Sequence, residues 1–555
     1  MRTLSRYTIA LMLASGMPCI LPAATTDSIS TDIQAVDVPA VAEPHPSDVP
    51  SIASEDLGLQ SSPSAAFADT TRVLSVRKEK VEVVHARKGD VSEGTDKDIR
   101  LLNIATRQQY SQADTGSYDT DIMSPKSARF STDGKTLFVN SLEGARTVVY
   151  DAATMEKKGV IHYNFISGNG DLWAPPSGYY PFTHYPDGEN IGFFGKPVES
   201  ALSHGGRYLW VPFYRRTFDR NAQDPSAIAV VDARTLEIVR MFETGPLPKM
   251  VAVSPDDSYV AITHWGDNTV GFIDISSDDM DKWHHLPPVT VGRKFVPNYP
   301  LDRDVDRDKG SGFLIRGTAF SPDGKWLLVS AMSGALYVID VTDMTVAATV
   351  PSLYGIRHLA IHGDDVYGSK NMIATVVKFS LDTLIANVEK ARAEGRMFIT
   401  PGKVHEVMVG KGTRTLDVSP DGRYVFVACN NESTVKVLNA SDLSLAAEIR
   451  ADSYPVGLAL SPDGRTLAVT SQGKKDGGGG NAVNVYRVEY AYLPELPAET
   501  TAPAEDGDSA ASSAIQFGNL RLKDVAWCTV GLLVIAANVI MVCGGRRRRN
   551  DYRRR

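Results

Sequence analysis

The chain has 555 residues, of which 43% are hydrophobic and 22% charged, and its formal net charge is −8. This composition supports a packed core. The negative charge argues against nucleic acid as a partner, because phosphate binding needs a dominant basic face. Three of the four cysteines fall in apolar terminal segments, so Cys429 has no partner for an internal disulfide in the body of the chain.

Two segments precede the region that we expect to fold. Residues 1–24 combine two arginines, an apolar stretch and a small-residue cleavage site, a pattern typical of a signal peptide. Residues 25–71 are rich in Ser, Ala, Pro and Asp and contain no Lys or Arg. Such a segment buries too little apolar surface to offset the entropy of ordering, so we predict a disordered acidic spacer.

A Ser-Pro-Asp-Gly-like sequence recurs through residues 72–490. An apolar run precedes each copy and a β-branched or aromatic run follows it, which predicts a hairpin with a tight turn. Clear copies begin at Ser254, Ser321, Ser419 and Ser461, and weaker copies begin at Ser131, Ser203 and His362. Two further strands follow in most copies. Seven repeats of four strands predict an all-β fold, a seven-bladed β-propeller with four-stranded blades.

The last repeat supplies only three clear strands, which end with residues 482–488. We predict that Arg100–Arg107, just before the first repeat, provides the fourth strand and closes the ring. One helical insertion is expected at Leu381–Gly395, because its apolar residues fall on one helical face.

The turn, the strand after it and sequences such as Asn268-Thr-Val-Gly-Phe-Ile-Asp274 resemble the YVTN-type seven-bladed propellers, which are similar to lactonase-like propellers. The resemblance extends from about Ser124 to Tyr490. It implies an exported protein, at the surface or in the periplasm, that binds ligands or partners. Some members of the group are lactone hydrolases.

Aligned repeats place cations at a shared position, five residues before the repeat start. In a propeller the strand before this turn is the innermost one, so these side chains are expected to converge at one mouth of the central channel. They suit an anion site, with Arg forks and Lys point charges; the alternative is local pairing with acids such as Glu199 or Asp417. The five residues are Lys126, Lys249, Arg316, Arg357 and Arg414.

Two other groups are weaker candidates. His264 and Trp265 occupy a turn and, together with His204, His284 and His285, could contribute to a metal or haem site, although turn residues of these types often pack between blades. Asp302, Asp304 and Asp306 alternate in one loop, as calcium ligands can. The neighbouring arginines favour a solvated charged loop instead. Calcium is therefore a minor possibility, and no other cofactor is predicted.

The C-terminal part predicts a membrane anchor. Residues 491–524 are a flexible stalk by composition, and residues 525–543 are uncharged over 19 positions, about the length that crosses a bilayer. The Arg-rich tail, residues 544–555, is expected to stay in the cytoplasm. The propeller would then be periplasmic or extracellular, and the lipid bilayer would contact the helix.

No familiar catalytic spacing occurs in the chain: it has no G-x-S-x-G elbow, zincin pair or phosphate loop. The leading prediction is a binding protein for an anionic small molecule, a glycan or an extracellular protein. It would bind through its channel mouth and through two aromatic loop insertions, Asn164–Glu189 and Lys282–Tyr299. A lactone or ester hydrolase is the first alternative. A cofactor-bearing oxidoreductase is the second, since haem-carrying propellers share this repeat style. Covalent c-type haem is excluded by the lack of Cys-x-x-Cys-His.

Overall fold

The computed structural model describes residues 83–492, except 110–116, 166, 181–192, 217–218, 220, 222, 301–304, 306, 308–311 and 474–478. The predicted signal peptide, spacer, transmembrane helix and tail lie outside these residues, as does nearly all of the stalk. Within the described residues, no helix is long and apolar enough to span a membrane.

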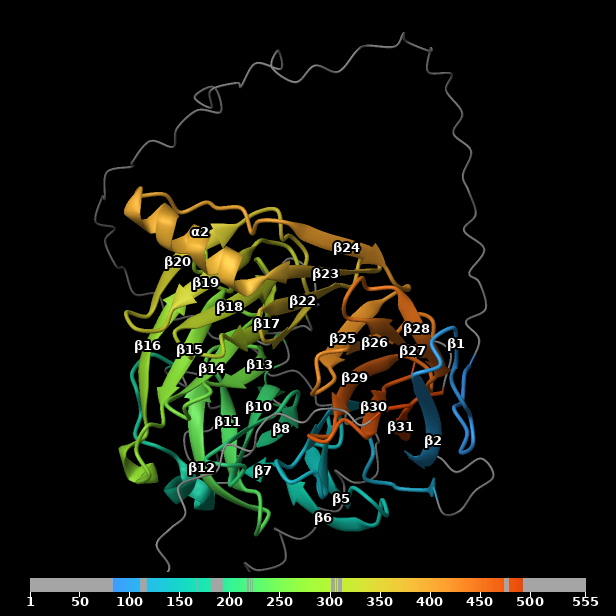
Figure 1. The fold of residues 1–555 in the computed structure, drawn as a ribbon. Coiled ribbons are helices and arrows are strands. Elements are labelled where there is room, and N and C mark those ends of the chain that lie inside the picture. Colours follow the sequence, from blue (N-terminus) through green and yellow to red (C-terminus); the bar gives the residue numbers. More distant parts are fainter. Residues whose placement is uncertain are drawn as a thin grey trace, which may run out of the picture. The chain divides into compact units, whose positions relative to one another are not determined.

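Seven antiparallel sheets follow one another along the chain (Figure 1). Blade 1 contains β3 (Pro125–Phe130), β4 (Thr136–Ser141), β5 (Arg146–Asp151) and β6 (Lys157–His162). Blade 2 contains β9 (Ala201–Ser203), β10 (Tyr208–Arg216), β11 (Ser226–Asp232) and β12 (Glu237–Thr244). Two earlier strands, β7 (Asn164–Phe165) and β8 (Phe193–Pro197), extend this sheet, and η2 (Ser167–Leu172) lies between them in the chain. Blade 3 contains β13 (Pro248–Val253), β14 (Tyr259–His264), β15 (Thr269–Asp274) and β16 (His284–Thr290), with η3 (Met280–Lys282) before its last strand. Blade 4 contains β17 (Ile315–Phe320), β18 (Trp326–Ala331), β19 (Leu336–Asp340) and β20 (Thr345–Val350).

The remaining blades are built in the same way. Blade 5 contains β21 (His358–His362), β22 (Asp365–Lys370), β23 (Thr375–Ser380) and β24 (Val404–Met408), and the predicted helix is present as α2 (Leu381–Ala393). Blade 6 contains β25 (Thr413–Val418), β26 (Tyr424–Cys429), β27 (Thr434–Asn439) and β28 (Leu445–Arg450), joined by β1 (Glu93–Gly94). Blade 7 contains β29 (Pro455–Leu460), β30 (Thr466–Ser471), β31 (Ala482–Tyr490) and β2 (Ile99–Gln108). The prediction of a seven-bladed propeller with four-stranded blades is confirmed.

Blade 7 is assembled from both ends of the described chain. β2 pairs with β31 in antiparallel register from Ile99 opposite Tyr490 to Gln108 opposite Ala482. The prediction of a closing strand before the first repeat is therefore confirmed. The pairing covers an edge of β31 that would otherwise be open to other strands.

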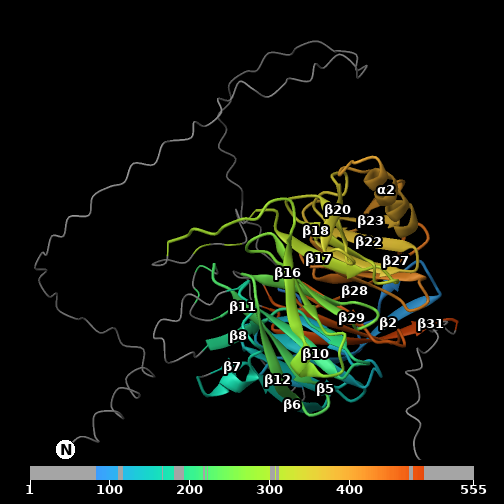
Figure 2. The ribbon, with the colours of Figure 1, turned by 90° about the vertical axis from the view of Figure 1, so that its left-hand side faces the viewer.

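The innermost strands of neighbouring blades contact one another around the ring: β3 with β29, β29 with β25, β25 with β21, β21 with β17, β17 with β13, and β13 with β9. Blades 1 and 2 meet through Arg129, whose Nε donates to the backbone oxygen of Ser200 at 3.1 Å. Figure 1 shows β13, β17, β25 and β29 toward the centre of the ring, and Figures 1 and 2 both show α2 at its outer rim. The apolar core consists of clusters shared between adjacent sheets.

Each innermost strand begins at one face of the ring, which we call the channel mouth, and ends in its Ser-Pro-Asp-Gly-like turn, which we call the turn end. In the turn at Ser419, Oγ donates to Asp421 at 2.6 Å and accepts from the Tyr424 N–H at 2.9 Å. Gly422 has φ +69°, a conformation in which other residues are strained. The turn chemistry predicted from the sequence is therefore present.

Candidate functional site

β-Bulges interrupt the innermost strands at the channel mouth. The antiparallel ladder of blade 1 skips Lys126, and that of blade 3 skips Lys249. Similar interruptions occur around Arg316, Arg414 and Val456 in blades 4, 6 and 7. A bulged residue is released from the ladder, so its side chain can be directed elsewhere. In four blades the released residue is one of the predicted cations.

The fifth cation reaches the mouth without a bulge. Arg357 immediately precedes β21, and its N–H donates to the backbone oxygen of Ser369 at 2.7 Å. Its Nη1 lies 2.9 Å from the Met332 sulfur and donates to it.

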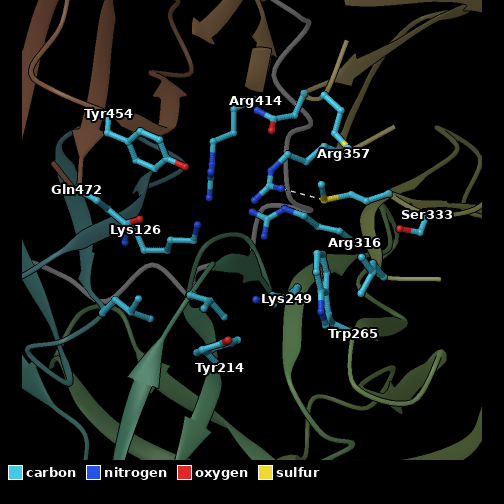
Figure 3. A pocket seen from close by; sticks show the side chains of 16 residues that line it. Lys126, Tyr214, Lys249, Trp265, Arg316, Ser333, Arg357, Arg414, Tyr454 and Gln472 are labelled. Carbon is cyan, nitrogen blue, oxygen red and sulfur yellow. Dashed lines mark hydrogen bonds between the residues drawn. The ribbon is translucent and has the colours of Figure 1, made fainter. Parts of the chain in front are cut away.

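All five predicted cations line one cavity of about 630 Å³ at the channel mouth. In Figure 3 the side chains of Lys126, Arg316, Arg357 and Arg414 point toward a common space, and Lys249 approaches it from the side of Trp265. The other lining residues are Leu142, Val198, Tyr214, Trp265, Leu314, Met332, Ser333, Asn371, Met372, Tyr454 and Gln472. The sequence therefore predicted which charges converge there.

Positive charge in this cavity is only partly compensated. Nη2 of Arg316 lies 2.9 Å from Oε1 of Glu199, one of the acids that the sequence offered as a local partner. The buried Nε atoms of Arg316 and Arg414 have no hydrogen-bond partner. Burial lowers the pKa of Arg414 to about 10, and Arg316 adds to this effect by repulsion. An anion with several oxygen atoms would satisfy these donors.

The rings of Tyr214 and Trp265 form an aromatic wall of the cavity, and Lys249 packs against both. Nζ of Lys249 lies 3.9 Å from the ring centre of Tyr214 and 4.7 Å from that of Trp265. The Trp265 indole N–H donates to the backbone oxygen of Arg307 at 2.9 Å, which fixes the ring. Cation–π contacts of this kind favour the charged ammonium.

His264 faces away from the cavity that its neighbour Trp265 lines. Its Nδ1 lies 2.8 Å from Oγ1 of Thr269, and its Nε2 accepts from the Gly245 N–H at 3.1 Å. Complete burial lowers its pKa to about 3, so the ring is neutral. Both ring nitrogens are engaged in local structure.

Two of the seven repeats place an apolar residue at the mouth. Val198 lines the cavity in blade 2, and Val456 occupies the bulge of blade 7. Lys196, two residues before Val198, forms an ion pair with Glu143 at 2.6 Å instead. The other acid considered as a partner, Asp417, accepts from the backbone N–H of Leu460 at 3.0 Å.

The weak calcium candidates Asp302, Asp304 and Asp306 lie outside the described residues, and that hypothesis stays a prediction. Within the part of the chain that the structure describes, no cluster of three or more His, Cys, Asp or Glu could hold a metal ion.

Sequence reasoning missed the neutral lining residues. Met332 follows β18 in blade 4, Tyr454 lies in the connection between blades 6 and 7, and Gln472 follows β30 in blade 7; no repeat position marks them. Glycine offers a partial signal, because a Cβ at Gly457 would lie 2.6 Å from the Lys126 backbone oxygen. Glycine at this position therefore allows β29 and β3 to approach closely at the mouth.

Residues 329–477 are similar to the Cytochrome D1 heme domain family. The match covers less than a third of the chain and runs from blade 4 into blade 7. A search of curated protein sequences gives no match.

Among solved structures, Kuenenia stuttgartiensis hydrazine synthase is 16% identical, with 68% of this chain and 99% of that chain covered and a TM-score of 0.45. The β-propeller domain of Myceliophteria thermophila Cps50 (Swd1) is 14% identical, with 69% and 99% covered and a TM-score of 0.44. At these TM-scores, neither likeness bears on function.

The family match corrects one expectation. The sequence led us to predict no cofactor beyond a minor possibility of calcium, and the similarity to a haem domain contradicts that prediction by pointing to haem. The repeat pattern could not reveal this, because turn and strand residues define the fold and say little about what the mouth binds. The proposed kinship with YVTN-type propellers is not confirmed beyond the seven-bladed fold.

Proposed function

We propose that the channel mouth binds a haem-type tetrapyrrole by its carboxylate groups. The observation that carries this proposal is the convergence of five cations, from five blades, on one cavity of about 630 Å³. Converging cations repel one another, and a bound polyanion would turn that repulsion into attraction. Arginine forks pair with carboxylates through two parallel hydrogen bonds.

The family match supports haem as the anion. Eight of the sixteen lining residues fall within the matched segment, residues 329–477, including Arg357 and Arg414. The same match favours the oxidoreductase alternative over the lactone hydrolase, because haem supplies redox chemistry at its iron when bound.

The residues of the cavity fit such a group. Ligand cavities commonly span about 300–1,000 Å³, so the volume suffices. Haem iron is held in proteins by His, Cys, Met or Tyr, and the lining offers the Met332 and Met372 thioethers and the Tyr214 and Tyr454 phenols. No histidine is among the lining residues, so these Met or Tyr side chains would be the ones to hold the iron.

Membrane anchoring is part of the same proposal. The apolar segment at residues 525–543 would hold the propeller outside the cytoplasm, and the ligand or an extracellular protein partner would reach the mouth from that side. The distribution of Arg after this segment supports that orientation.

The test is a titration of the detergent-solubilised full chain with haemin, followed by absorbance. We expect Arg316→Ala/Arg414→Ala to weaken binding by about 2–5 kcal/mol, the usual cost of deleting a buried charged partner. The control Arg423→Ala/Arg487→Ala removes two arginines whose side chains are 51% and 56% exposed and which lie away from the mouth. Equal affinity of both variants would overturn the proposal.

A further inference from the structure

The two lysines of the cavity differ in their surroundings. Lys249 rests against the Tyr214 and Trp265 rings, which stabilise its charge. Lys126 has no cation–π contact and no ion pair among the described residues. Both lysines are buried, with Lys126 7% and Lys249 8% exposed. Aromatic rings therefore lie against the Lys249 ammonium and not against that of Lys126.

The groups that face Lys126 disfavour its ammonium form. Burial has the largest effect, and Arg414, Arg316 and Arg357 add repulsion, so the pKa of Lys126 lies well below its usual value of 10.5. Glu199 acts in the opposite direction but is engaged by Arg316 at 2.9 Å. A neutral amine keeps the lone pair that makes lysine a nucleophile, and a desolvated lysine beside other cations is a recognised way to obtain it.

We propose that Lys126 is a nucleophilic amine that forms an imine with a 2-oxo acid held at the channel mouth. The inference goes beyond haem binding and does not rest on it. It is carried by the position of Lys126, a buried amine with no ion pair among the described residues, within a cavity whose arginines can bind a carboxylate.

The arrangement suits a carbonyl compound with an adjacent carboxylate. The arginines at positions 316, 357 and 414 point toward the same space as Lys126 in Figure 3. Buried Nε atoms of Arg316 and Arg414 lack a hydrogen-bond partner in the structure. A carboxylate held by these groups would place its neighbouring carbonyl carbon close to the Lys126 amine, and such positioning lowers the barrier for addition.

The step balances without a further reactant. The Lys126 nitrogen adds to the carbonyl carbon, the carbonyl π bond opens, and a proton passes from nitrogen to oxygen to give a carbinolamine. The hydroxyl then leaves with the second amine proton as water, and a carbon–nitrogen double bond remains. Protonation of this nitrogen from solvent gives an iminium, which can accept electrons from the adjoining carbon.

A simpler role for Lys126 would be a fifth point charge for a polyanion. In that role the bound anion would restore the ammonium, and no covalent adduct would form. The two roles are distinguished by chemical trapping.

The experiment uses the solubilised full chain, pyruvate or 2-oxoglutarate as probe, and borohydride to reduce any imine. We expect one reduced adduct per chain, located by peptide mapping at Lys126 and not at Lys249. An exposed lysine with a pKa of about 10.4 is neutral to roughly one part in a few thousand at pH 7. Labelling of Lys126 should therefore exceed that of any exposed lysine by at least about tenfold.

Lys126→Arg should abolish the adduct, and the control Lys325→Arg, at a side chain that is 70% exposed, should retain it. If Lys126→Arg does not fold, the map of the unaltered chain still decides the matter, and excess sulfate should protect Lys126 there. Absence of an adduct, or adducts spread over exposed lysines, would overturn the proposal. The haemin titration has its own readout, so failure of either proposal leaves the other intact.

Discussion

The two ends of the innermost strands are built on opposite principles. At the turn end, the same contacts recur: the Ser Oγ donates to the following Asp in the turns at Ser131, Ser254, Ser321, Ser419 and Ser461, with distances of 2.5–2.6 Å. At the mouth, bulges release cations that are buried beside one another. The Ser and Asp side chains of these five turns pair with each other, whereas the buried Nε atoms of Arg316 and Arg414 at the mouth have no hydrogen-bond partner.

This difference separates stability from function along one strand. A satisfied turn contributes to folding and needs no ligand. A group of buried cations costs stability and is retained in proteins where a partner offsets the cost. We therefore expect changes at the turn end to alter unfolding, and changes at the mouth to alter binding.

The largest effect should come from opening the ring, because both the turn end and the mouth depend on a closed ring. Deleting residues 25–108 removes β2 and exposes edges of β31 and its neighbours, so we expect aggregation in size-exclusion chromatography. Deleting residues 25–71 serves as the control and should leave a monodisperse protein with unchanged thermal unfolding. Similar behaviour of both deletions would contradict the closing role of β2.

Two single substitutions, one at each end of the strands, should differ in their effect on the free energy of unfolding. Ser419→Ala removes the acceptor of the Tyr424 N–H and should lower the free energy of unfolding by about 1–3 kcal/mol. Lys126→Met removes a buried amine and should leave this free energy unchanged or raise it by about 1 kcal/mol. Chemical denaturation measures both. A destabilised Lys126→Met protein would show that the mouth also contributes to folding.

The smallest effects should appear in the pH dependence of stability. The hydrogen bond from Ser131 and the Lys135 N–H hold the pKa of Asp133 below 3.8, so its contribution is present above that pH and is lost in acid, as pH falls through the folded pKa. The lowered pKa of Lys126 affects stability at higher pH. Between the pKa of Lys126 in the folded protein and about 10.4, the unfolded chain binds more protons than the folded one, so the free energy of unfolding should rise with pH.

Denaturation across the pH range would test both signs. The difference between the unaltered chain and Asp133→Asn should shrink in acid, and that between the unaltered chain and Lys126→Met should change in alkali. A flat difference in either range would contradict the corresponding assignment.

The sequence was sufficient for the fold because the turn end repeats. Pro-Asp-Gly favours a tight turn, and the apolar and β-branched residues around it favour strands. Each copy could therefore be recognised as a hairpin independently of the others. The cations at the mouth could be placed only by counting from those turns, and their convergence follows from the ring.

What the sequence could not supply was how the mouth side chains are directed. The bulge that releases Lys126 is a feature of pairing between strands. The contrast between Lys126 and Lys249 depends on the ring of Tyr214, in strand β10 of another blade, and on the ring of Trp265, in the turn after β14. His264 and Trp265 are adjacent in sequence, yet the structure places them on different sides of the cavity wall. The identity of the ligand depends on such details, which is why the absence of a cofactor was predicted wrongly.

The pairing of β2 with β31 also has a consequence for synthesis. Ile99 leaves the ribosome long before its partner Tyr490 is translated. Six blades can therefore form while β2 is not yet paired with β31. Contacts this distant in sequence form slowly, and an unpaired strand invites association with other nascent chains. A chaperone that shields β2 during synthesis should therefore raise the yield of native protein more than one that acts on the finished ring.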